Sequence, residues 1–417
     1  MTMNRRELLA ALGSVAAIGI APESSRFPQL LMTQEGPASV SLSAKSDFAI
    51  PAGLTYINSA YTHPMPLAAA AALREWADFR SQPKAVSEPK KLINVKAEFA
   101  ALINAKESEI SYVTSTSAGE NLVVNGLGLD YKTDNVVTDA LHFEGAILHL
   151  QALQQRFGLD LRIVKPRNWR IDLSDLERVV NKKTKLVEIS LVAMDNGFQH
   201  DLKAVCDLAH AHGAYVYADI AQAAGNTPID VRNSAVDFCA CSSFKWLMAD
   251  FGLGFLFVKE GLLDKVISRT QYGYFEAKTL DSHFLPGDSP NPAVYTWELE
   301  NDASGHFEVG THAIATAHVL AQSLPYIRRL GVENIRAHRQ PMLKRLHEEM
   351  PRLGFEPLTP PESTSALISF AIKNYEAIAG RLEKASVNAR VAQRFIRISP
   401  SVFNDMKDID RLLEALS

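Results

Sequence analysis

The chain has 417 residues, of which 47% are hydrophobic and 22% charged, and these proportions are ordinary for a globular enzyme with room for two domains. Its formal net charge of -4, spread over interspersed acidic and basic residues, leaves no basic stripe for a nucleic acid. Three cysteines in a chain of this length cannot form a disulfide framework, and no Cys/His cluster has zinc-like spacing, so small-molecule chemistry without a bound metal is favoured.

The N-terminus combines a positive segment with a short apolar one. Asn4-Arg5-Arg6 precedes a run of Ala, Gly, Leu and Ile that continues to Ile20, a pattern typical of a twin-arginine export signal. The run is too short for a transmembrane helix, which needs about 20 apolar residues. We therefore expect a signal peptide at residues 1–21 and a periplasmic or otherwise exported protein. If this segment is instead an ordinary amphipathic helix, we expect a cytoplasmic one.

Residues 22–46 are rich in Gly, Pro and Ser and predict a flexible linker. Beyond them, helical patterns at residues 67–79 and 97–105 precede a regular series of short apolar runs. Strand candidates lie at 110–113, 135–138, 161–164, 186–192, 214–218, 238–241 and 255–258. Continuous apolar strands separated by helices predict an α/β fold with a mainly parallel sheet that helices cover on both faces.

One helix is especially clear between the strands. Asp201 can cap its start, an apolar stripe follows, and Gly213 ends it. After about residue 305 the pattern changes to long helices and then to β segments at 366–372 and 395–398. We therefore expect a large domain over residues 47–304 and a smaller C-terminal domain over residues 305–417.

A carboxylate and a lysine follow two of the predicted strands. Asp219 ends the run 214–218, and Lys245 comes shortly after the run 238–241. A pyridoxal phosphate enzyme requires a lysine that forms a Schiff base and an acid that keeps the pyridine nitrogen protonated. A lone aspartate at a strand end is usually a helix cap, but the downstream lysine favours the cofactor. We expect pyridoxal 5'-phosphate, with Gln222 in reach of its phenolic oxygen.

Hydroxyl groups gather where the cofactor phosphate would need them. Thr114 to Glu120 leads from a strand into a helix, and hydroxyls with free N–H groups at a helix N-terminus form an anion site. Ser and Thr are equally common there as plain caps. Ser242 and the pair Gly310-Thr311 offer further hydroxyls.

Three isolated polar residues are further candidates. His142 follows the strand 135–138, where an aromatic ring could stack on the pyridine and tune proton transfer, although an isolated histidine is more often a plain loop residue. Asn196 lies in a turn by composition, and whether its amide faces the cofactor stays open. Arg397 is a charge inside an apolar run, and a substrate carboxylate would satisfy its need for a partner.

Together these segments resemble the class V aminotransferases of pyridoxal fold type I, the group that contains cysteine desulfurases and isopenicillin N epimerase. The likeness spans roughly residues 56–416, and its carriers are Tyr56–Ala60, Tyr217–Asp219 with Gln222, Ser242–Lys245, Phe307–Thr311 and Arg397–Pro400. It implies a fold type I PLP-dependent transferase with a mainly parallel seven-stranded sheet flanked by helices and a smaller α+β C-terminal domain. It also implies a homodimer that shares its active sites between subunits.

The resemblance assigns roles to individual residues. Lys245 would be the Schiff-base lysine, Asp219 the partner of the pyridinium and His142 the stacking ring, and these three form the catalytic set. The other predicted cofactor contacts are Ser117, Ala118, Asn196, Gln222, Ser242 and, from the neighbouring subunit, Thr311. Arg397 and Asn58 would bind the substrate.

The chain also departs from this family. Desulfurases carry a mobile catalytic cysteine in the C-terminal third, whereas Cys206, Cys239 and Cys241 all precede the lysine, so we do not expect a persulfide on the enzyme. Phe244 replaces the histidine that desulfurases place before their lysine, and Met194 stands where many relatives carry asparagine. The overall likeness favours the epimerase-like branch.

The expected reaction takes place at the α-carbon of an amino acid or an amino-acid-derived metabolite or peptide. The substrate amine displaces Lys245, whose freed amine removes the α-proton. Epimerisation, loss of a β-substituent and transamination stay open, and export weighs mildly against transamination. The alternative of another class is a PLP-binding protein without turnover, or a structural α/β domain. We expect neither a nucleic acid partner nor a membrane partner beyond the export machinery.

Overall fold

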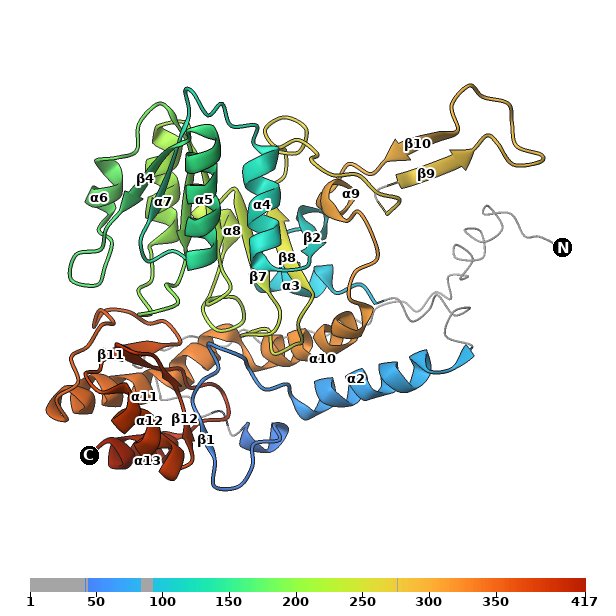
Figure 1. Ribbon diagram of the computed structural model, residues 1–417. Coiled ribbons are helices and arrows are strands. Elements are labelled where there is room, and N and C mark those ends of the chain that lie inside the picture. The colour runs from blue at the N-terminus through green and yellow to red at the C-terminus, as the bar shows by residue number, and fades with distance from the viewer. Residues whose placement is uncertain (1–41, 43, 84–92, 276) are drawn as a thin grey trace, which may run out of the picture. The chain divides into compact units, whose positions relative to one another are not determined.

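The computed structural model describes residues 42, 44–83, 93–275 and 277–417 (Figure 1). The expected signal peptide at residues 1–21 and most of the expected linker at residues 22–46 lie outside the described residues. Within the described ranges, no helix has both the length and the apolar character that a membrane span requires.

A seven-stranded sheet carries the large part of the chain (Figure 1). All seven predicted runs form strands of this sheet: β2 (Ile110–Val113), β3 (Asn135–Asp139), β4 (Asp160–Val164), β5 (Thr184–Ser190), β6 (Tyr215–Asp219), β7 (Phe238–Ser242) and β8 (Gly254–Val258). The strand order is β2-β8-β7-β6-β5-β3-β4. Strands β3 to β7 run parallel, and β8 runs antiparallel to both of its neighbours. The predicted α/β class and mainly parallel sheet are confirmed.

Helices cover both faces of this sheet, because alternate residues of each strand point to opposite sides. On one face, Leu186 and Phe238 pack against α4 (Thr116–Gly126) and α5 (Glu144–Phe157). On the other, Val187 and Val216 pack in the cluster that includes α3 (Lys96–Leu102), α7 (Leu202–Ala211) and α10 (Ile314–Leu330). As predicted, the Asp201 carboxylate caps α7 by accepting from the Ala204 N–H at 3.0 Å.

A second core lies in the C-terminal part of the chain. Its elements are α11 (Val332–Arg352), β11 (Ile368–Ala371), α12 (Tyr375–Lys384), β12 (Val387–Asn388), β13 (Arg390–Val391), β14 (Phe395–Ile398) and α13 (Met406–Leu416). Strands β11, β14 and β13 form an antiparallel sheet, and β1 (Thr55–Tyr56) pairs with β12. Ile57 is buried in this core, which ties the start of the described chain to its end.

The remaining elements connect or flank these two cores. They are the 3-10 turns η1 (Lys45–Asp47) and η4 (Glu107–Glu109), the helices α2 (Leu67–Arg80), α6 (Leu173–Glu177), α8 (Val231–Ser234) and α9 (Ala303–Phe307), and the antiparallel hairpin of β9 (Ala277–Ser282) and β10 (Tyr295–Leu299). The hairpin extends away from the large sheet in Figure 1. No sequence pattern above predicted it.

Gly119 brings α4 unusually close to the sheet. A Cβ atom at this position would lie 2.9 Å from the Cβ of Ala240 on β7, closer than packed carbon atoms approach. This contact sets the N-terminus of α4 beside the end of β7, where the Thr116 N–H donates to the Ser242 Oγ at 3.1 Å. Two of the segments predicted to bind phosphate therefore meet.

We expect Gly119→Ala to lower the free energy of unfolding by about 1–3 kcal/mol, because the added methyl overpacks the helix–sheet contact. Gly380→Ala is the matched control, since Gly380 also lies inside a helix but a Cβ there meets nothing within 4 Å. The control should gain up to about 1 kcal/mol from helix propensity. Urea unfolding measures both, and equal gains would refute the close approach.

Candidate active site

The polar residues predicted from separate strands meet at one edge of the sheet. Because β3, β5, β6 and β7 run parallel, the segments that follow them emerge on the same side, where α/β sheets bind their ligands. Asp219 is the last residue of β6, Ser242 is the last residue of β7, and Lys245 lies in the loop after Ser242. His142 follows β3 in the same way.

The Lys245 amine lies in a largely buried, charged environment. Burial lowers its pKa, the Asp219 charge opposes this, and the charges of Arg397 and Arg390 lower the pKa further. A lowered pKa increases the fraction of neutral, nucleophilic amine at a given pH. The Asp219 carboxylate is itself buried and accepts a hydrogen bond from the Ala221 N–H at 2.8 Å.

Gln222 fixes the loop that carries Lys245. Its Oε1 accepts from the indole N–H of Trp246 at 2.9 Å, and its Nε2 donates to the Ala60 carbonyl at 3.0 Å. The carboxamide has a second N–H, which is suited to a phenolate oxygen. Gln222 therefore links the lysine loop to the segment 56–60 that sequence analysis singled out.

The N-terminus of α4 and the end of β7 form an anion-binding corner. Ser115 caps the helix by accepting from the Ala118 N–H at 3.1 Å, and the Thr116 hydroxyl lies 3.0 Å from that of Ser242. The half-buried Ser117 lies in the first turn of α4, where N–H groups and the helix dipole favour an anion. This arrangement suits the phosphate of the expected cofactor.

Thr311 lines a cleft next to this corner. The cleft has a volume of about 670 Å³, and its lining includes Thr114, Ala118 and Gly310. The Thr311 hydroxyl is exposed and lies 2.7 Å from the hydroxyl of Tyr274. Thr311 was predicted to reach the phosphate from the neighbouring subunit, but Thr311 and Ala118 of the same chain line one cleft.

His142 is buried and held on two sides. Its Nδ1 lies 2.8 Å from the Oγ of Ser190, the last residue of β5. The loop before it is fixed by Asp139, whose carboxylate accepts from the Leu141 N–H at 2.8 Å and lies 3.1 Å from the Nε2 of His200. This loop therefore presents the His142 ring in one orientation.

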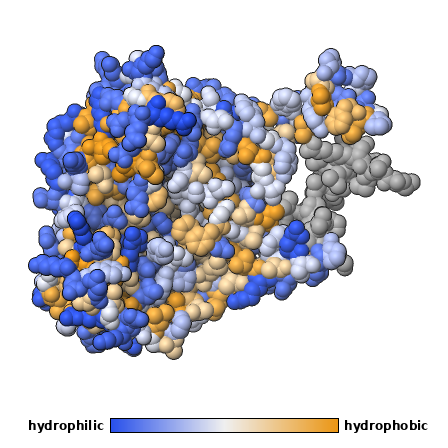
Figure 2. Space-filling model, in the orientation of Figure 1, coloured by the Kyte–Doolittle hydropathy of each residue, from blue (hydrophilic) through white to orange (hydrophobic). Residues whose placement is uncertain are grey.

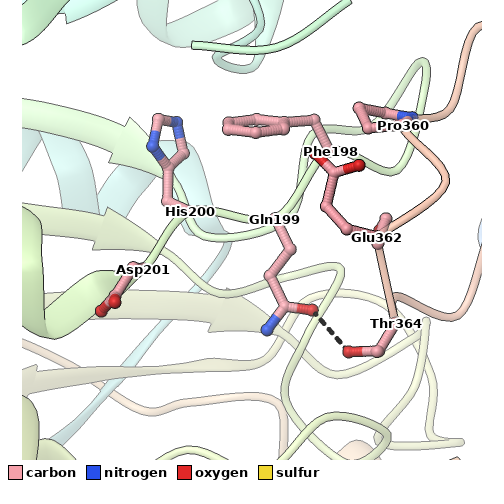
Figure 3. A pocket seen from close by; sticks show the side chains of 8 residues that line it. Phe198, Gln199, His200, Asp201, Pro360, Glu362 and Thr364 are labelled. Atoms are coloured by element: carbon pink, nitrogen blue, oxygen red, sulfur yellow. Dashed lines mark hydrogen bonds between the residues drawn. The ribbon is translucent and has the colours of Figure 1, made fainter. Parts of the chain in front are cut away.

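His200 also lines a separate small cavity, which Figure 3 shows between residues 198–201 and the segment 360–364. Its volume is about 250 Å³, and Gln199 and Thr364 hydrogen-bond across it at 3.4 Å (Figure 3). None of the predicted site residues lines this cavity. Its connection to the site is indirect, through the contact of His200 with Asp139.

Arg397 is a buried cation with unused hydrogen-bond donors. Its side chain is 0% exposed, and Nη1 donates to the Met194 carbonyl at 2.8 Å. Among the described residues, its Nε and Nη2 have no acceptor. Burial lowers the pKa of Arg397 to about 10, the nearby Arg390 adds to this, and Asp195 opposes it. A buried, incompletely paired guanidinium fits the carboxylate of a ligand.

Asn58 offers a second polar group of this kind. Its Nδ2 donates to Asn388 at 3.1 Å, while its buried Oδ1 has no donor among the described residues. The backbone of Asn58 bridges that of Ser399, two residues after Arg397. The structure therefore brings both predicted substrate-binding residues onto neighbouring segments.

Asn196 does not share this arrangement. Its Nδ2 donates to the carbonyls of Trp169 and Leu358 at 2.7 and 3.2 Å, and its Oδ1 accepts from the Phe198 N–H at 3.0 Å. These bonds fix the turn after β5, so each of these contacts of Asn196 is with the backbone, and its predicted contact with the cofactor stays a prediction.

Sequence reasoning missed two acidic side chains beside His142. Glu188 lies in the middle of β5 and is 0% exposed, and Glu120 lies on α4 at 2% exposed. Glu188 could have been found by the argument applied to Arg397, because it is also a charge inside an apolar run.

Residues 79–412 match the family model described as aminotransferase class-V. A probable cysteine desulfurase from Methanothermobacter thermautotrophicus is 27% identical over 330 residues, 77% of this chain and 78% of the relative.

Solved structures show the same fold. An apo cysteine desulfurase from Thermococcus onnurineus NA1 has a TM-score of 0.78 at 24% identity and covers 91% of this chain and 98% of its own. The cystine C-S lyase C-DES in complex with its product cysteine persulfide has a TM-score of 0.74 at 22% identity, covering 88% and 97%. A C-DES mutant with glycine covalently linked to its PLP cofactor has a TM-score of 0.76 at 20% identity, covering 89% and 98%.

We expect Arg397→Met to raise the free energy of unfolding of the substrate-free protein by about 1–3 kcal/mol, because it removes a buried guanidinium whose Nε and Nη2 have no acceptor among the described residues. The same variant should lose binding of amino acid carboxylates. Arg232→Met is the control: it removes the ion-pair partner of the buried Glu109 and should cost about 1–3 kcal/mol. Urea unfolding compares them. If both variants are destabilised, Arg397 is a structural residue.

Proposed function

The chain belongs to the class V aminotransferase family and is a pyridoxal phosphate-dependent enzyme, and on this premise we propose that it is a lyase that breaks the bond between the β-carbon and sulfur of an amino acid. The relatives and structural neighbours named above are cysteine desulfurases and a cystine lyase, which supports carbon–sulfur chemistry. Epimerisation and transamination gain no such support.

The observation that carries the proposal is the burial of every cysteine. Cys206, Cys239 and Cys241 are 0%, 1% and 0% exposed. Burial raises the pKa of Cys206 to about 12, and it is also the largest cause of the raised pKa of Cys239 and Cys241. Since only a thiolate attacks sulfur, these side chains are unsuited to receive it. The sulfur would leave the enzyme in a small molecule.

In the proposed reaction, the residues of the site would have separate roles. Lys245 and Asp219 would hold the cofactor aldehyde and ring nitrogen, and Ser117 and Ser242 would hold its phosphate. When bound, the cofactor supplies an electron sink for the pair of electrons left at the α-carbon. The neutral amine of Lys245 takes the α-proton, and its lowered pKa suits it to this role. Arg397 holds the substrate carboxylate and so fixes which bonds face the lysine.

Product analysis separates the possible reactions. With L-cystine, a lyase consumes water and releases pyruvate, ammonia and cysteine persulfide. A desulfurase releases alanine from cysteine and leaves sulfur on a protein thiol. An epimerase yields the opposite enantiomer, and a transaminase requires a keto acid.

We expect the purified protein to be yellow and to form pyruvate from L-cystine or a related β-thio amino acid, without alanine. Lys245→Ala should lose turnover by about a thousandfold or more, because the proton acceptor is gone. Lys265→Ala is the control and should keep turnover. Lys265 follows β8, which runs antiparallel to β7 and therefore ends at the sheet edge opposite the site. Alanine with protein-bound sulfur, or an enantiomerised substrate, would overturn the lyase assignment. A colourless protein that stays colourless with added cofactor would remove its premise.

We also propose that the enzyme is a homodimer whose hairpin β9–β10 packs on the second copy. Large apolar side chains on and around the hairpin are exposed, from 41% to 71%: Tyr272, Tyr274, Phe284, Leu285, Val294, Tyr295 and Trp297. Figure 2 shows apolar side chains gathered on this projecting part of the molecule. A lone two-stranded hairpin is marginally stable in water, so a covering surface is needed. Tyr274 contacts Thr311, which places this surface next to the phosphate-binding corner.

Trp297→Glu should convert the dimer to a monomer, because a charge would replace an apolar contact in the interface. Leu148→Glu is the control, since Leu148 is 69% exposed on α5, away from the hairpin. Light scattering after size-exclusion chromatography gives the mass of each protein. A monomeric wild type, or dimers of both variants, would refute the interface.

A further inference from the structure

Glu188 is a buried carboxyl group without an ordinary partner. It lies on β5 between Thr138 of β3 and Tyr217 of β6, and its side chain is 0% exposed. Among the described residues, no N–H or hydroxyl group donates to either carboxyl oxygen. Its Oε1 lies 3.6 Å from the Nε2 of His142. A carboxyl group in such a place requires a proton or another acid to share one with.

The other side of His142 indicates its tautomer. The Ser190 Oγ accepts from the Phe143 N–H at 3.2 Å and lies 2.8 Å from the His142 Nδ1. Since the hydroxyl accepts from the backbone, its own hydrogen is available to donate to Nδ1. The proton of a neutral His142 ring is then on Nε2, the nitrogen that faces Glu188.

A second buried acid, Glu120, interacts with Glu188 and contacts the partly exposed His149. Glu120 is 2% exposed, and its Oε1 lies 2.8 Å from the Nδ1 of His149, a side chain that is 15% exposed. Burial and, after it, the charge of Glu188 raise the pKa of Glu120. Two carboxyl groups that interact in this way repel each other when both are ionised, so the pair favours holding a proton.

The electrostatics of the pair agree with this geometry. Burial raises the pKa of Glu120 to about 7, with the Glu188 charge as the next cause. Burial raises the pKa of Glu188 to about 8, against the opposing effect of the His149 charge. Burial would lower the pKa of His149, but its hydrogen bond to Glu120 and the charges of both acids raise it.

The groups that face this pair come from every neighbouring element. They are His149 on α5, His142 after β3, and Tyr217 and Asp219 on β6. Burial keeps the pKa of Tyr217 well above its usual value, so Tyr217 stays protonated. Burial lowers the pKa of His142, and the charges of Asp219, Asp139 and Glu120 oppose that effect. The acids and histidines therefore titrate as a coupled group.

We propose that Glu188 is a positioning residue for His142: its buried carboxyl group lies beside Nε2, holds a proton, orients the imidazole and sets its protonation state in the active site. The inference rests on the proposed function of the sheet edge as the catalytic site. While Glu188 holds its proton, His142 faces a neutral acid and stays neutral. When Glu188 loses it, a carboxylate faces Nε2 and favours the imidazolium.

The raised pKa of Glu188 makes the free energy of unfolding depend on pH in one direction. Glu188 has a higher pKa in the folded protein than its ordinary value of 4.5, so the folded state holds more protons between that value and pH about 8. Stability from this group is fully present below pH 4.5 and is lost as the pH rises through about 8. A side chain that only accepted hydrogen bonds would give no such dependence.

The test uses Glu188→Gln in the full-length holoenzyme, with Asp237→Asn as matched control. Asp237 is a buried carboxylate 2.7 Å from His210, just before β7 begins and hence at the opposite edge of the sheet. We expect Glu188→Gln to raise the urea midpoint at pH 8 but not at pH 5, whereas the control loses stability at both. The kcat of Glu188→Gln should fall on the order of tenfold with little change in KM.

Two further measurements read His142 and the cofactor directly. Nitrogen-15 imidazole spectra, assigned with His142→Asn, should show the Nε2–H tautomer in wild type and a mixture in Glu188→Gln. The visible band of wild type should change between pH about 7 and about 8, and the change should vanish in the variant. If the tautomer, the band and the pH-dependent stability are all unchanged in Glu188→Gln, the inference is overturned. Absence of turnover in wild type defeats the proposed function, but leaves the tautomer and stability results to decide the role of Glu188.

Discussion

The parallel pairing of β3, β5, β6 and β7 is the constraint on which the site depends. Parallel strands end on the same side of a sheet, so residues far apart in sequence gather there without needing long loops. Asp219 and Ser242 are the last residues of β6 and β7, and Lys245 lies in the loop just after Ser242. Their positions therefore follow from backbone hydrogen bonds, which are the least adjustable part of the fold. The close approach of α4 at Gly119 adds the helix terminus to the same edge.

Two buried side chains of the candidate site have hydrogen-bonding atoms without a partner among the described residues. These atoms are Nε and Nη2 of Arg397 and both carboxyl oxygens of Glu188, and both side chains are 0% exposed. Neither arrangement favours folding, because a buried charge or polar group without a partner costs free energy. Their presence is understandable if ligands or bound protons complete them. The buried polar groups of the site thus lower the stability of the fold, and the apolar clusters of the two cores offset this cost.

Much of the fold was predictable, because its signals are local. Seven apolar runs became the seven strands, and the Asp201 cap follows a short-range rule of helix chemistry. The chemical residues Lys245 and Asp219 were recognisable since each follows a strong strand. The role of Asn196 stays open from sequence, because an amide in a turn has the same sequence signal whether it binds a ligand or the backbone, and the hydrogen bonds found for it are to the backbone. The hairpin β9–β10 escaped prediction for a different reason: most of the large apolar side chains on and around it are exposed, so the burial that shapes strand patterns applies only weakly within one chain.

The location of the cysteines bears on where a sulfur atom could go at this site. A sulfur atom leaving the β-carbon must go to a nucleophile or into solution, and the nearest thiols along the chain, Cys239 and Cys241, lie inside the core of β7. Strand alternation turns both of them to the face opposite Ala240 and Ser242, and so away from the face on which the site residues lie. To reach the substrate, either thiol would have to break the central sheet. The same strand that presents Ser242 to the site therefore keeps its two thiols away from it, and this arrangement is the basis of the proposal that sulfur leaves in a small molecule.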